Sequence, residues 1–126
     1  MRVHLESVSA SLEDYLEAIY FLTKKNPQVR VTDVARELDI SKPSVNRAIN
    51  TLKKQGFVNH EHYGDLCLTE QGVKIAQDIA SRHELIRGFL MNSLGVDEKT
   101  AELEACLIEH NLSADTVEKL RKFVEK

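Results

Sequence analysis

No apolar stretch in this 126-residue sequence approaches the roughly 20 residues that a membrane-spanning helix needs. The first residues, MRVHLESVSAS, also lack the apolar core of a signal peptide, so we expect a cytoplasmic protein with no membrane partner. The sequence has only two cysteines, Cys67 and Cys106, which lie far apart. In a reducing cytosol we expect free thiols or metal ligands rather than a disulfide.

The sequence also lacks internal repeats, low-complexity stretches and linker-like segments, and its length fits one compact domain or two small ones that share a core. An excess of positive charge is missing too, because the formal net charge is −3. Residues 22–56 nevertheless carry eight Lys and Arg against three acidic residues, a local charge of +5 that leaves −8 for the rest. This distribution predicts one part that faces phosphates and an acidic remainder suited to cations.

Hydrophobic periodicity predicts a mainly α protein in which two short strands interrupt the helices. A first helix starts at Ser11 and ends before Asn26-Pro27. Residues 57–63 and 66–68 predict a β-hairpin. N-cap residues predict the later helix starts, at Thr32, Ser41, Thr69, Asp97 and Ser113. This order predicts an N-terminal winged helix-turn-helix domain, residues 1–72, and a C-terminal helical domain, residues 73–126.

The third predicted helix has one apolar face and one polar, basic face. Val45, Ile49 and Leu52 are expected to pack inward, whereas Arg47 and Asn50 point the opposite way. Arg and Asn make paired hydrogen bonds with guanine and adenine edges, and a helix N-terminus suits phosphate. We therefore predict contacts with double-stranded DNA through Thr32, Ser41, Lys42, Pro43, Ser44, Asn46, Arg47, Asn50, Lys54 and Tyr63. The alternatives are an ordinary solvated face and a helix-turn-helix that binds protein.

Side chains of the types that bind transition metals gather in three helical segments. Cys106, Glu109 and His110 have the spacing i, i+3 and i+4, which predicts one helix face with a half-buried thiol. Asp14 and Glu17 are one turn apart on the first helix. Oxygen ligands suit Mn²⁺ and Fe²⁺, and a thiolate favours Fe²⁺, Co²⁺, Ni²⁺ or Zn²⁺. The predicted metal ligands are Asp14, Glu17, His83, Cys106, Glu109 and His110.

Each of these side chains also has a structural interpretation. Ser11 and Asp14 have the spacing of a capping box, Glu17 would pass as surface charge, and His83 could be a hydrogen-bonded, half-buried histidine. Cys106 could be a redox sensor, although no resolving cysteine lies nearby in the sequence.

The hairpin holds three further candidate ligands. His60 and His62 alternate along a predicted strand and so share a face, but we expect them to be ordinary wing residues. Cys67 occupies an apolar strand position, and we expect a small core residue there.

Six segments resemble the iron- and manganese-dependent repressors of the diphtheria toxin repressor / manganese transport regulator family. The resemblance covers essentially the whole chain. It implies that the N-terminal winged helix binds operator DNA, that the C-terminal helices form a homodimer, and that a divalent metal at the junction acts as co-repressor through the six ligands named above. The segments are EDYLEAIY (13–20), VTDVAREL (31–38), SKPSV (41–45), LTEQG (68–72), RHEL (82–85) and CLIEH (106–110).

The sequence departs from both branches of that family. Asp14 is similar to the manganese branch, which has a glutamate in place of Cys106, whereas the cysteine is similar to the iron branch, which usually has Met in place of Asp14. Arg87 and Glu102 stand where the iron branch has an acid and a histidine of an ancillary site, so the resemblance implies that this second site is incomplete. The chain ends at Lys126, which leaves no room for the SH3-like domain of longer members.

We therefore expect a metal-dependent repressor of metal-uptake genes that binds a palindromic operator as a homodimer when it is loaded with Mn²⁺ or Fe²⁺. The alternative is a metal-independent winged-helix regulator or interaction module in which the acids and histidines are structural. A metal-dependent hydrolase is a third possibility, but the sequence offers no separate general base, so we expect neither an enzyme nor a small-molecule substrate.

Overall fold

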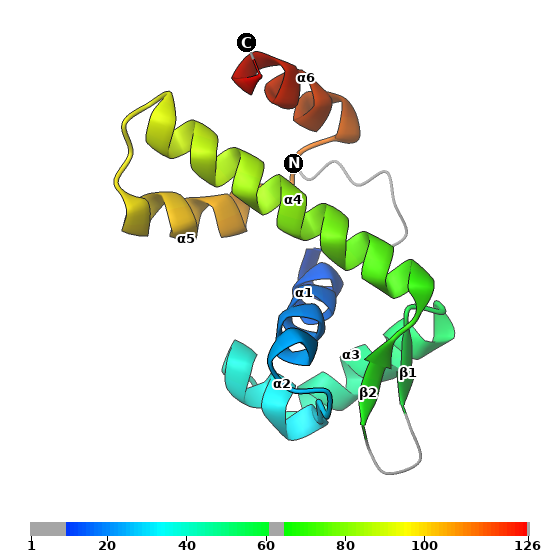
Figure 1. Cartoon of the computed structure of the whole chain (residues 1–126). Coiled ribbons are helices and arrows are strands. Elements are labelled where there is room, and N and C mark those ends of the chain that lie inside the picture. The colour runs from blue at the N-terminus through cyan, green and yellow to red at the C-terminus, as the bar shows by residue number, and fades with distance from the viewer. Residues whose placement is uncertain (1–9, 61–64, 126) are drawn as a thin grey trace. The chain divides into compact units, whose positions relative to one another are not determined.

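The computed structural model describes residues 10–60 and 65–125, and this part of the chain forms six helices and one β-hairpin (Figure 1). The chain divides into two compact units, an N-terminal unit, Ser11–Gln77, and a C-terminal unit that contains Asp78–Lys126. The mainly α class and the element order are confirmed, whereas the domain boundary after residue 72 stays a prediction. The elements are α1 Ala10–Lys25, α2 Val31–Leu38, α3 Lys42–Lys54, β1 Val58–His60, β2 Leu66–Leu68, α4 Glu70–Asn92, α5 Glu98–Ile108 and α6 Ala114–Val124.

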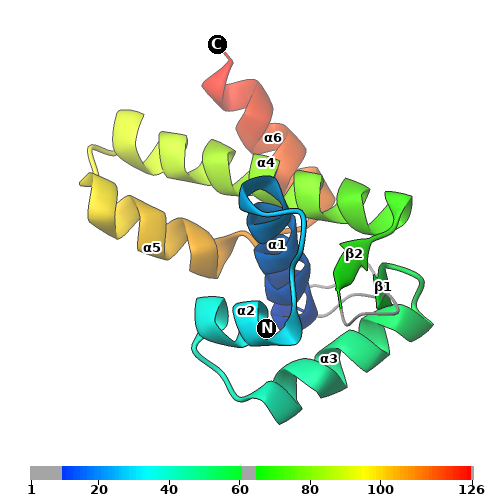
Figure 2. The same ribbon diagram turned by 60° about the horizontal axis from the view of Figure 1, so that its bottom comes forward.

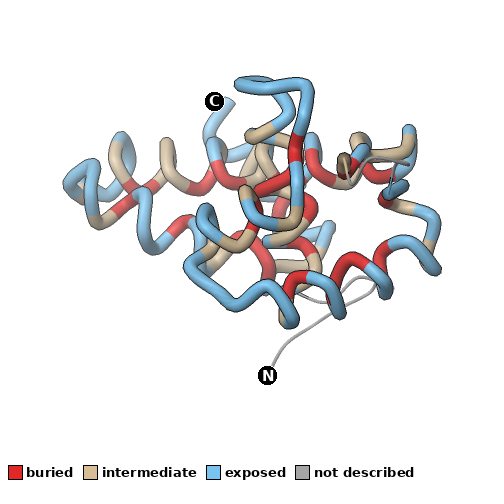
Figure 3. The backbone as a smooth tube through the Cα atoms, turned by 90° about the horizontal axis from the view of Figure 1, so that it is seen from below, coloured by how far each residue is buried: buried red, intermediate tan, exposed pale blue. Residues whose placement is uncertain are grey.

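The N-terminal unit has its core between the apolar sides of α1, α2 and α3. Buried and exposed positions alternate along the helices, as expected for amphipathic segments (Figure 3). Burial of one Leu, Ile or Val side chain stabilises the fold by about 1.5–3 kcal/mol, so these contacts hold the three helices together. The buried side chains include Leu16, Ile19, Val34, Val45, Ala48, Ile49 and Leu52.

The turn between α2 and α3 has well-defined caps at both ends. Asp39 adopts the left-handed conformation with φ 55°, and the Ile40 N–H donates to the Ala35 carbonyl at 3.0 Å, which closes α2. Ser41 caps α3 as predicted, because its Oγ accepts the Ser44 N–H at 3.3 Å. Pro43 lies in the first turn of α3, where a missing N–H leaves no helix hydrogen bond unmade.

Thr32 is not the N-cap of α2. The helix starts at Val31, and the N-cap is Arg30, whose N–H donates to the Asp33 carboxylate at 2.9 Å. Asp33, the third residue of the helix, therefore accepts a hydrogen bond from the N-cap backbone, and Thr32 lies inside the first turn. The start of α1 is also one residue earlier than predicted, at Ala10 instead of Ser11.

The hairpin pairs β1 with β2 in antiparallel register, with Val58 opposite Leu68 and His60 opposite Leu66. Leu66 is buried and also bridges to Val29, whereas Cys67 is exposed. The prediction of Cys67 as a core residue was wrong, because successive strand residues face opposite sides and Leu66 takes the inward side. The first strand is shorter than the predicted 57–63, and residues 61–64 lie outside the described part of the chain.

The C-terminal unit packs α5 and α6 against the second half of α4. α5 lies beside that half of α4 in both ribbon views (Figure 1 and Figure 2), and its Ala101 and Ala105 pack against Ile86 and Leu90 of α4. The small side chains on α5 allow this close approach. Ser113 caps α6 as predicted, with its Oγ accepting the Thr116 N–H at 3.1 Å. Among the described residues, no helix combines the length and the apolarity that crossing a membrane requires.

Candidate metal centre and DNA-binding surface

α3 separates an inward apolar face from an exposed polar face, as predicted. Val45, Ile49 and Leu52 are buried, whereas Arg47 and Asn50 are exposed. The other predicted DNA-binding residues on and before this helix, Ser41, Lys42, Pro43, Asn46 and Lys54, are exposed, and Ser44 is half-buried. Thr32 is exposed on α2, and Tyr63 lies outside the described residues.

Hydrogen bonds organise the N-terminal end of α3. The Ser41 hydroxyl donates to the Ser44 Oγ at 2.9 Å, and Nη2 of Arg47 donates to the same oxygen at 3.3 Å. Arg47 is therefore held along the helix with its guanidinium near the helix start. Its charge also acts on α1, because it partly opposes the burial that raises the pKa of the Tyr15 hydroxyl. A fixed cation beside a helix N-terminus favours binding of an anion such as phosphate.

In the C-terminal unit, the imidazole of His83 lies within a cluster of potential metal ligands. His83 is 8% exposed on α4, and its Nε2 lies 2.9 and 2.8 Å from the two oxygens of Glu102. Its Nδ1 lies 3.4 Å from Oε2 of Glu109 and 3.7 Å from Sγ of Cys106. His83, Glu102 and Cys106 each offer one ligand atom within 4.8 Å of the others, a spacing that a single ion can bridge. An imidazole, a thiol and carboxylates are a fitting ligand set for a divalent transition metal.

Glu109 and His110 extend this cluster. Glu109 is 0% exposed, and Nε2 of the buried His110 lies 3.5 Å from its Oε1. Arg82 of α4 donates from Nη1 to the Glu109 carbonyl oxygen at 3.1 Å and so fixes this part of the backbone. Four of the six predicted ligands, His83, Cys106, Glu109 and His110, are thus brought together.

The observed arrangement of Cys106, Glu109 and His110 differs from the predicted helix face in two respects. The helix ends at Ile108, and Glu109 is its C-cap, although Glu109 keeps helical dihedral angles and its N–H still donates to the Ala105 carbonyl at 2.9 Å. Cys106 is exposed instead of half-buried, whereas Glu109 and His110 are buried. The chain turns inward directly after the helix, which separates the exposed thiol from the buried pair.

Glu102 was missed as a neighbour of His83. It is one turn before Cys106 on α5, and the i, i+4 spacing of the two residues was the available signal. Asp14 and Glu17 are one turn apart on α1 in the N-terminal unit, with Asp14 exposed and Glu17 half-buried. Their place in the ligand set stays a prediction.

Comparison with known proteins assigns both halves of the chain. Residues 7–66 match the family model described as "Iron dependent repressor, N-terminal DNA binding domain". Residues 69–126 match "Iron dependent repressor, metal binding and dimerisation domain". An uncharacterized HTH-type transcriptional regulator of Methanocaldococcus jannaschii is 42% identical over 120 residues, which cover 94% of this chain and 96% of that protein. The chain belongs to the iron-dependent repressor family.

Other similar proteins agree with this family assignment. The HTH-type transcriptional regulator MntR of Shouchella clausii is 36% identical and aligns with 91% of this chain and 80% of its own length. The solved structure of the manganese regulator SloR has a TM-score of 0.81 at 31% identity over 90% of this chain. The chain spans about half the length of that protein, 53%. ScaR, solved with bound Zn²⁺, has a TM-score of 0.80 at 28% identity.

The family fixes the general role of the two halves. The protein is a transcriptional regulator, not an enzyme, with a DNA-binding half and a metal-binding and dimerisation half. The predicted resemblance and the predicted class of function are therefore confirmed at this level. The helices that carry His83, Cys106, Glu109 and His110 all lie in the half that matches the metal-binding model.

Proposed function

We propose that this family member is a repressor of metal-uptake genes that binds a palindromic operator as a homodimer when Mn²⁺ or Fe²⁺ is bound. The observation that carries the proposal is the cluster around His83, where Cys106 and Glu109 both lie within 3.7 Å of Nδ1. A thiol, a carboxylate and an imidazole are all side-chain types that bind divalent transition metals, and Glu109 is buried beside the imidazole. The proposed repressor acts in the cytoplasm, where its operator DNA lies.

The proposed ligand set keeps all six predicted residues. His83, Cys106, Glu109 and His110 come from the C-terminal unit, and the family resemblance adds Asp14 and Glu17 from α1. A bound divalent cation supplies the positive charge that compensates these acids and the thiolate. The five carboxylate and imidazole ligands favour Mn²⁺ or Fe²⁺, and Cys106 moves the preference toward Fe²⁺, Co²⁺, Ni²⁺ or Zn²⁺. The ligand set is Asp14, Glu17, His83, Cys106, Glu109 and His110.

The DNA-binding surface is proposed to use α3 and its flanks. Arg47 and Asn50 read base edges in the major groove, whereas Lys42 and Lys54 bind phosphates. A homodimer presents two copies of α3 to adjacent major grooves roughly 34 Å apart, which favours a palindromic operator. The remaining contacts come from Thr32, Ser41, Pro43, Ser44, Asn46 and Tyr63.

Metal regulation follows from electrostatics. Without a cation, the acids and the thiolate of the ligand set repel one another, and α1 is not tied to the dimer. With the cation bound, ligands on α1 and on the C-terminal unit share one positive charge, so the DNA-binding half is fixed. Moving an equilibrium from 1:99 to 99:1 takes about 5.5 kcal/mol of differential binding, which metal coordination can supply.

The test replaces single ligands and measures DNA affinity in the presence and absence of metal. A duplex is first selected from random sequences with the full chain in Mn²⁺. We expect His83→Ala and Glu109→Ala to abolish the dependence of affinity on Mn²⁺, Fe²⁺, Co²⁺ or Zn²⁺, because each removes a ligand. Glu104→Ala is the matched control, an exposed acid on the same helix outside the cluster. Metal-dependent binding that survives both ligand variants unchanged would favour the alternative, a regulator whose acids and histidines are structural.

A further inference from the structure

We propose that Glu102, held by Arg87, is a positioning residue that fixes the tautomer of His83 with the proton on Nε2, so that Nδ1 is the nitrogen that binds the metal. This assigns to Glu102 a role outside the proposed ligand set. The inference rests on the proposed metal site at His83, but it does not depend on DNA binding.

The contacts of Nε2 identify it as the hydrogen-bonding nitrogen. Both oxygens of Glu102 lie at hydrogen-bond distance from it, 2.9 and 2.8 Å. A carboxylate only accepts hydrogen bonds, so Nε2 must carry the proton. In a neutral imidazole the other nitrogen then has a free lone pair, as a metal ligand requires. Metal-binding histidines commonly donate their second N–H to a carboxylate, which fixes both tautomer and ring orientation.

The contacts of Nδ1 identify it as the metal-facing nitrogen. Oε2 of Glu109 and Sγ of Cys106 lie 3.4 and 3.7 Å from it. Both atoms belong to the proposed ligand set, so an ion bound by the lone pair of Nδ1 can also contact Glu109 and Cys106. Two of the proposed ligands, Glu109 and Cys106, therefore lie on the Nδ1 side of the ring, whereas Glu102 lies on the Nε2 side.

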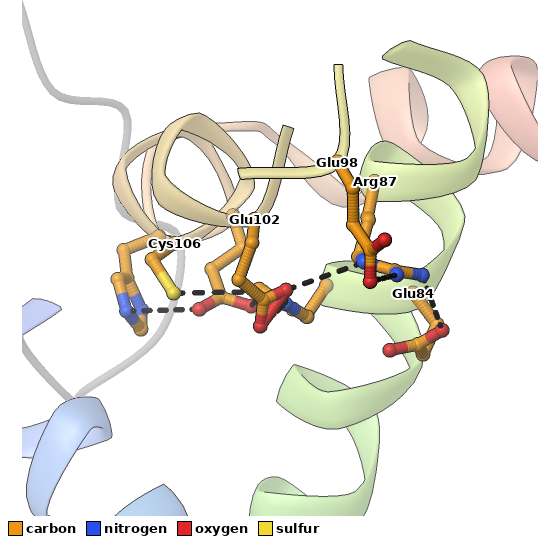
Figure 4. Close-up of polar contacts among 8 residues, drawn as sticks. Glu84, Arg87, Glu98, Glu102 and Cys106 are labelled. Carbon is orange, nitrogen blue, oxygen red and sulfur yellow. Dashed lines mark hydrogen bonds and ion pairs between the residues drawn. The ribbon is translucent and has the colours of Figure 1, made fainter. Parts of the chain in front are cut away.

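Arg87 explains why Glu102 orients the ring and does not bind the ion. Nε of Arg87 lies 3.4 Å from Oε2 of Glu102, and the same guanidinium lies 3.3 Å from Glu98 and 3.8 Å from Glu84 (Figure 4). Arg87 is one turn after His83 on α4, and Glu102 faces both side chains from α5. A carboxylate already compensated by a guanidinium attracts a second cation less strongly. The arginine thus directs Glu102 toward Nε2 of His83.

Nitrogen NMR of the full chain tests the tautomer directly. Long-range proton–nitrogen correlations of ¹⁵N-labelled protein are recorded without metal and with Zn²⁺, and the His83 signals are assigned by their loss in His83→Gln. We expect a protonated Nε2 in both states and a Zn²⁺-bound Nδ1 in the second. A protonated Nδ1, or Zn²⁺ bound through Nε2, would overturn the proposal.

Zn²⁺ affinity of matched variants separates a positioning role from a ligand role. Glu102→Ala should weaken Zn²⁺ binding by about 10- to 100-fold, as loss of such an orienting carboxylate does elsewhere, and should give a mixture of His83 tautomers in the metal-free protein. Glu102→Gln should recover most of the affinity, because its amide oxygen still accepts from Nε2–H. Glu98→Ala is the control for charge and for loss of an Arg87 partner, and it should stay within about fivefold of wild type.

Two results would contradict this pattern. If Glu102→Gln lost as much Zn²⁺ affinity as Glu102→Ala, Glu102 would be a direct ligand. If Glu98→Ala lost as much Zn²⁺ affinity as Glu102→Ala, the effect of Glu102 would be one of general negative charge. Both measurements are made without DNA. Metal-independent DNA binding would therefore overturn the proposed regulation and leave this inference in place.

Discussion

At the scale of single residues, His83 and Arg47 show how neighbouring groups hold a side chain in each half of the protein in place for the role proposed for it. His83 is buried, and both of its ring nitrogens face acceptors from α5 and its C-cap. Arg47 is exposed but held by Ser44 at the start of α3. In both cases neighbouring polar groups restrict the rotamers before a ligand arrives, which lowers the entropy lost on binding.

Arg47→Ala should weaken binding to the selected duplex by about 1–3 kcal/mol and relax specificity at one base pair, because a paired contact with guanine is lost. Lys54→Ala, which removes a proposed phosphate contact on the same helix, should weaken binding to all sequences alike and reduce its salt dependence. Affinities for the selected duplex and for single-base variants measure both effects. An Arg47→Ala loss that is uniform across sequences would assign Arg47 to the phosphate backbone instead.

Gly72→Ala should destabilise the fold, because a Cβ at this position would overlap the backbone carbonyl of Phe57. The expected cost is about 1–3 kcal/mol, as for other forced overlaps in a packed site. Gly88→Ala is the matched substitution on the same helix, where the nearest atom, Nδ2 of Asn92, is 3.9 Å away. It should stabilise by about 0.5–1 kcal/mol through helix propensity. Denaturant unfolding of both variants checks the opposite signs, and equal effects would contradict the account.

At the scale of helices and strands, local chemistry determined most boundaries. Ser41, Asp97 and Ser113 cap the helices that were predicted to follow them, since a short acceptor side chain can bind an N–H of the first turn without help from the rest of the fold. Thr32 does not take this role, because α2 already starts at Val31 and its N-cap is Arg30. The prediction for Cys67 was wrong because the pairing register with β1 determines which side chains face the core, and the sequence of one strand does not reveal that register.

The cap of α5 predicts a pH dependence. Hydrogen bonds from the Thr100 backbone and side chain hold the pKa of the Asp97 carboxyl below its usual value. A carboxyl with a depressed pKa in the folded state stabilises the fold fully above its unfolded pKa, and this contribution is lost as pH falls through the folded pKa. The difference in unfolding midpoint between wild type and Asp97→Asn should therefore be largest near neutral pH and shrink in acid. A difference that stays constant down to pH 2 would contradict this explanation of the cap.

At the scale of the whole molecule, hydrophobic periodicity predicted the element order, and the resemblance of six segments predicted the family. The candidate site was only partly predictable. Cys106, Glu109 and His110 are close in sequence, so they lie near one another although α5 ends at Ile108. The contact of Glu102 with His83 depends on how α5 packs against α4, and the burial of Glu109 depends on the turn after Ile108. The spacing of Glu102 and Cys106 places both on one face of α5, but it does not show which residues of α4 that face contacts.

We predict that the exposed apolar side of α5 forms part of the dimer interface, because this half of the chain matches the dimerisation domain of the family. Leu103 and Leu107 are one turn apart and are each 64% exposed. We expect Leu103→Asp combined with Leu107→Asp to convert the dimer to a monomer, since charge would be buried at the interface. The helical circular dichroism of the monomer should stay unchanged. Light scattering measures the mass, and an intact dimer would exclude this side of α5 from the interface.

The most direct test of metal-dependent regulation is the affinity of the full chain for its selected duplex in Mn²⁺ or Fe²⁺ and in EDTA. We predict that removing the metal lowers the affinity by about 100-fold, near the upper part of typical coupling between two sites. Equal affinity in EDTA and in metal would contradict the central claim.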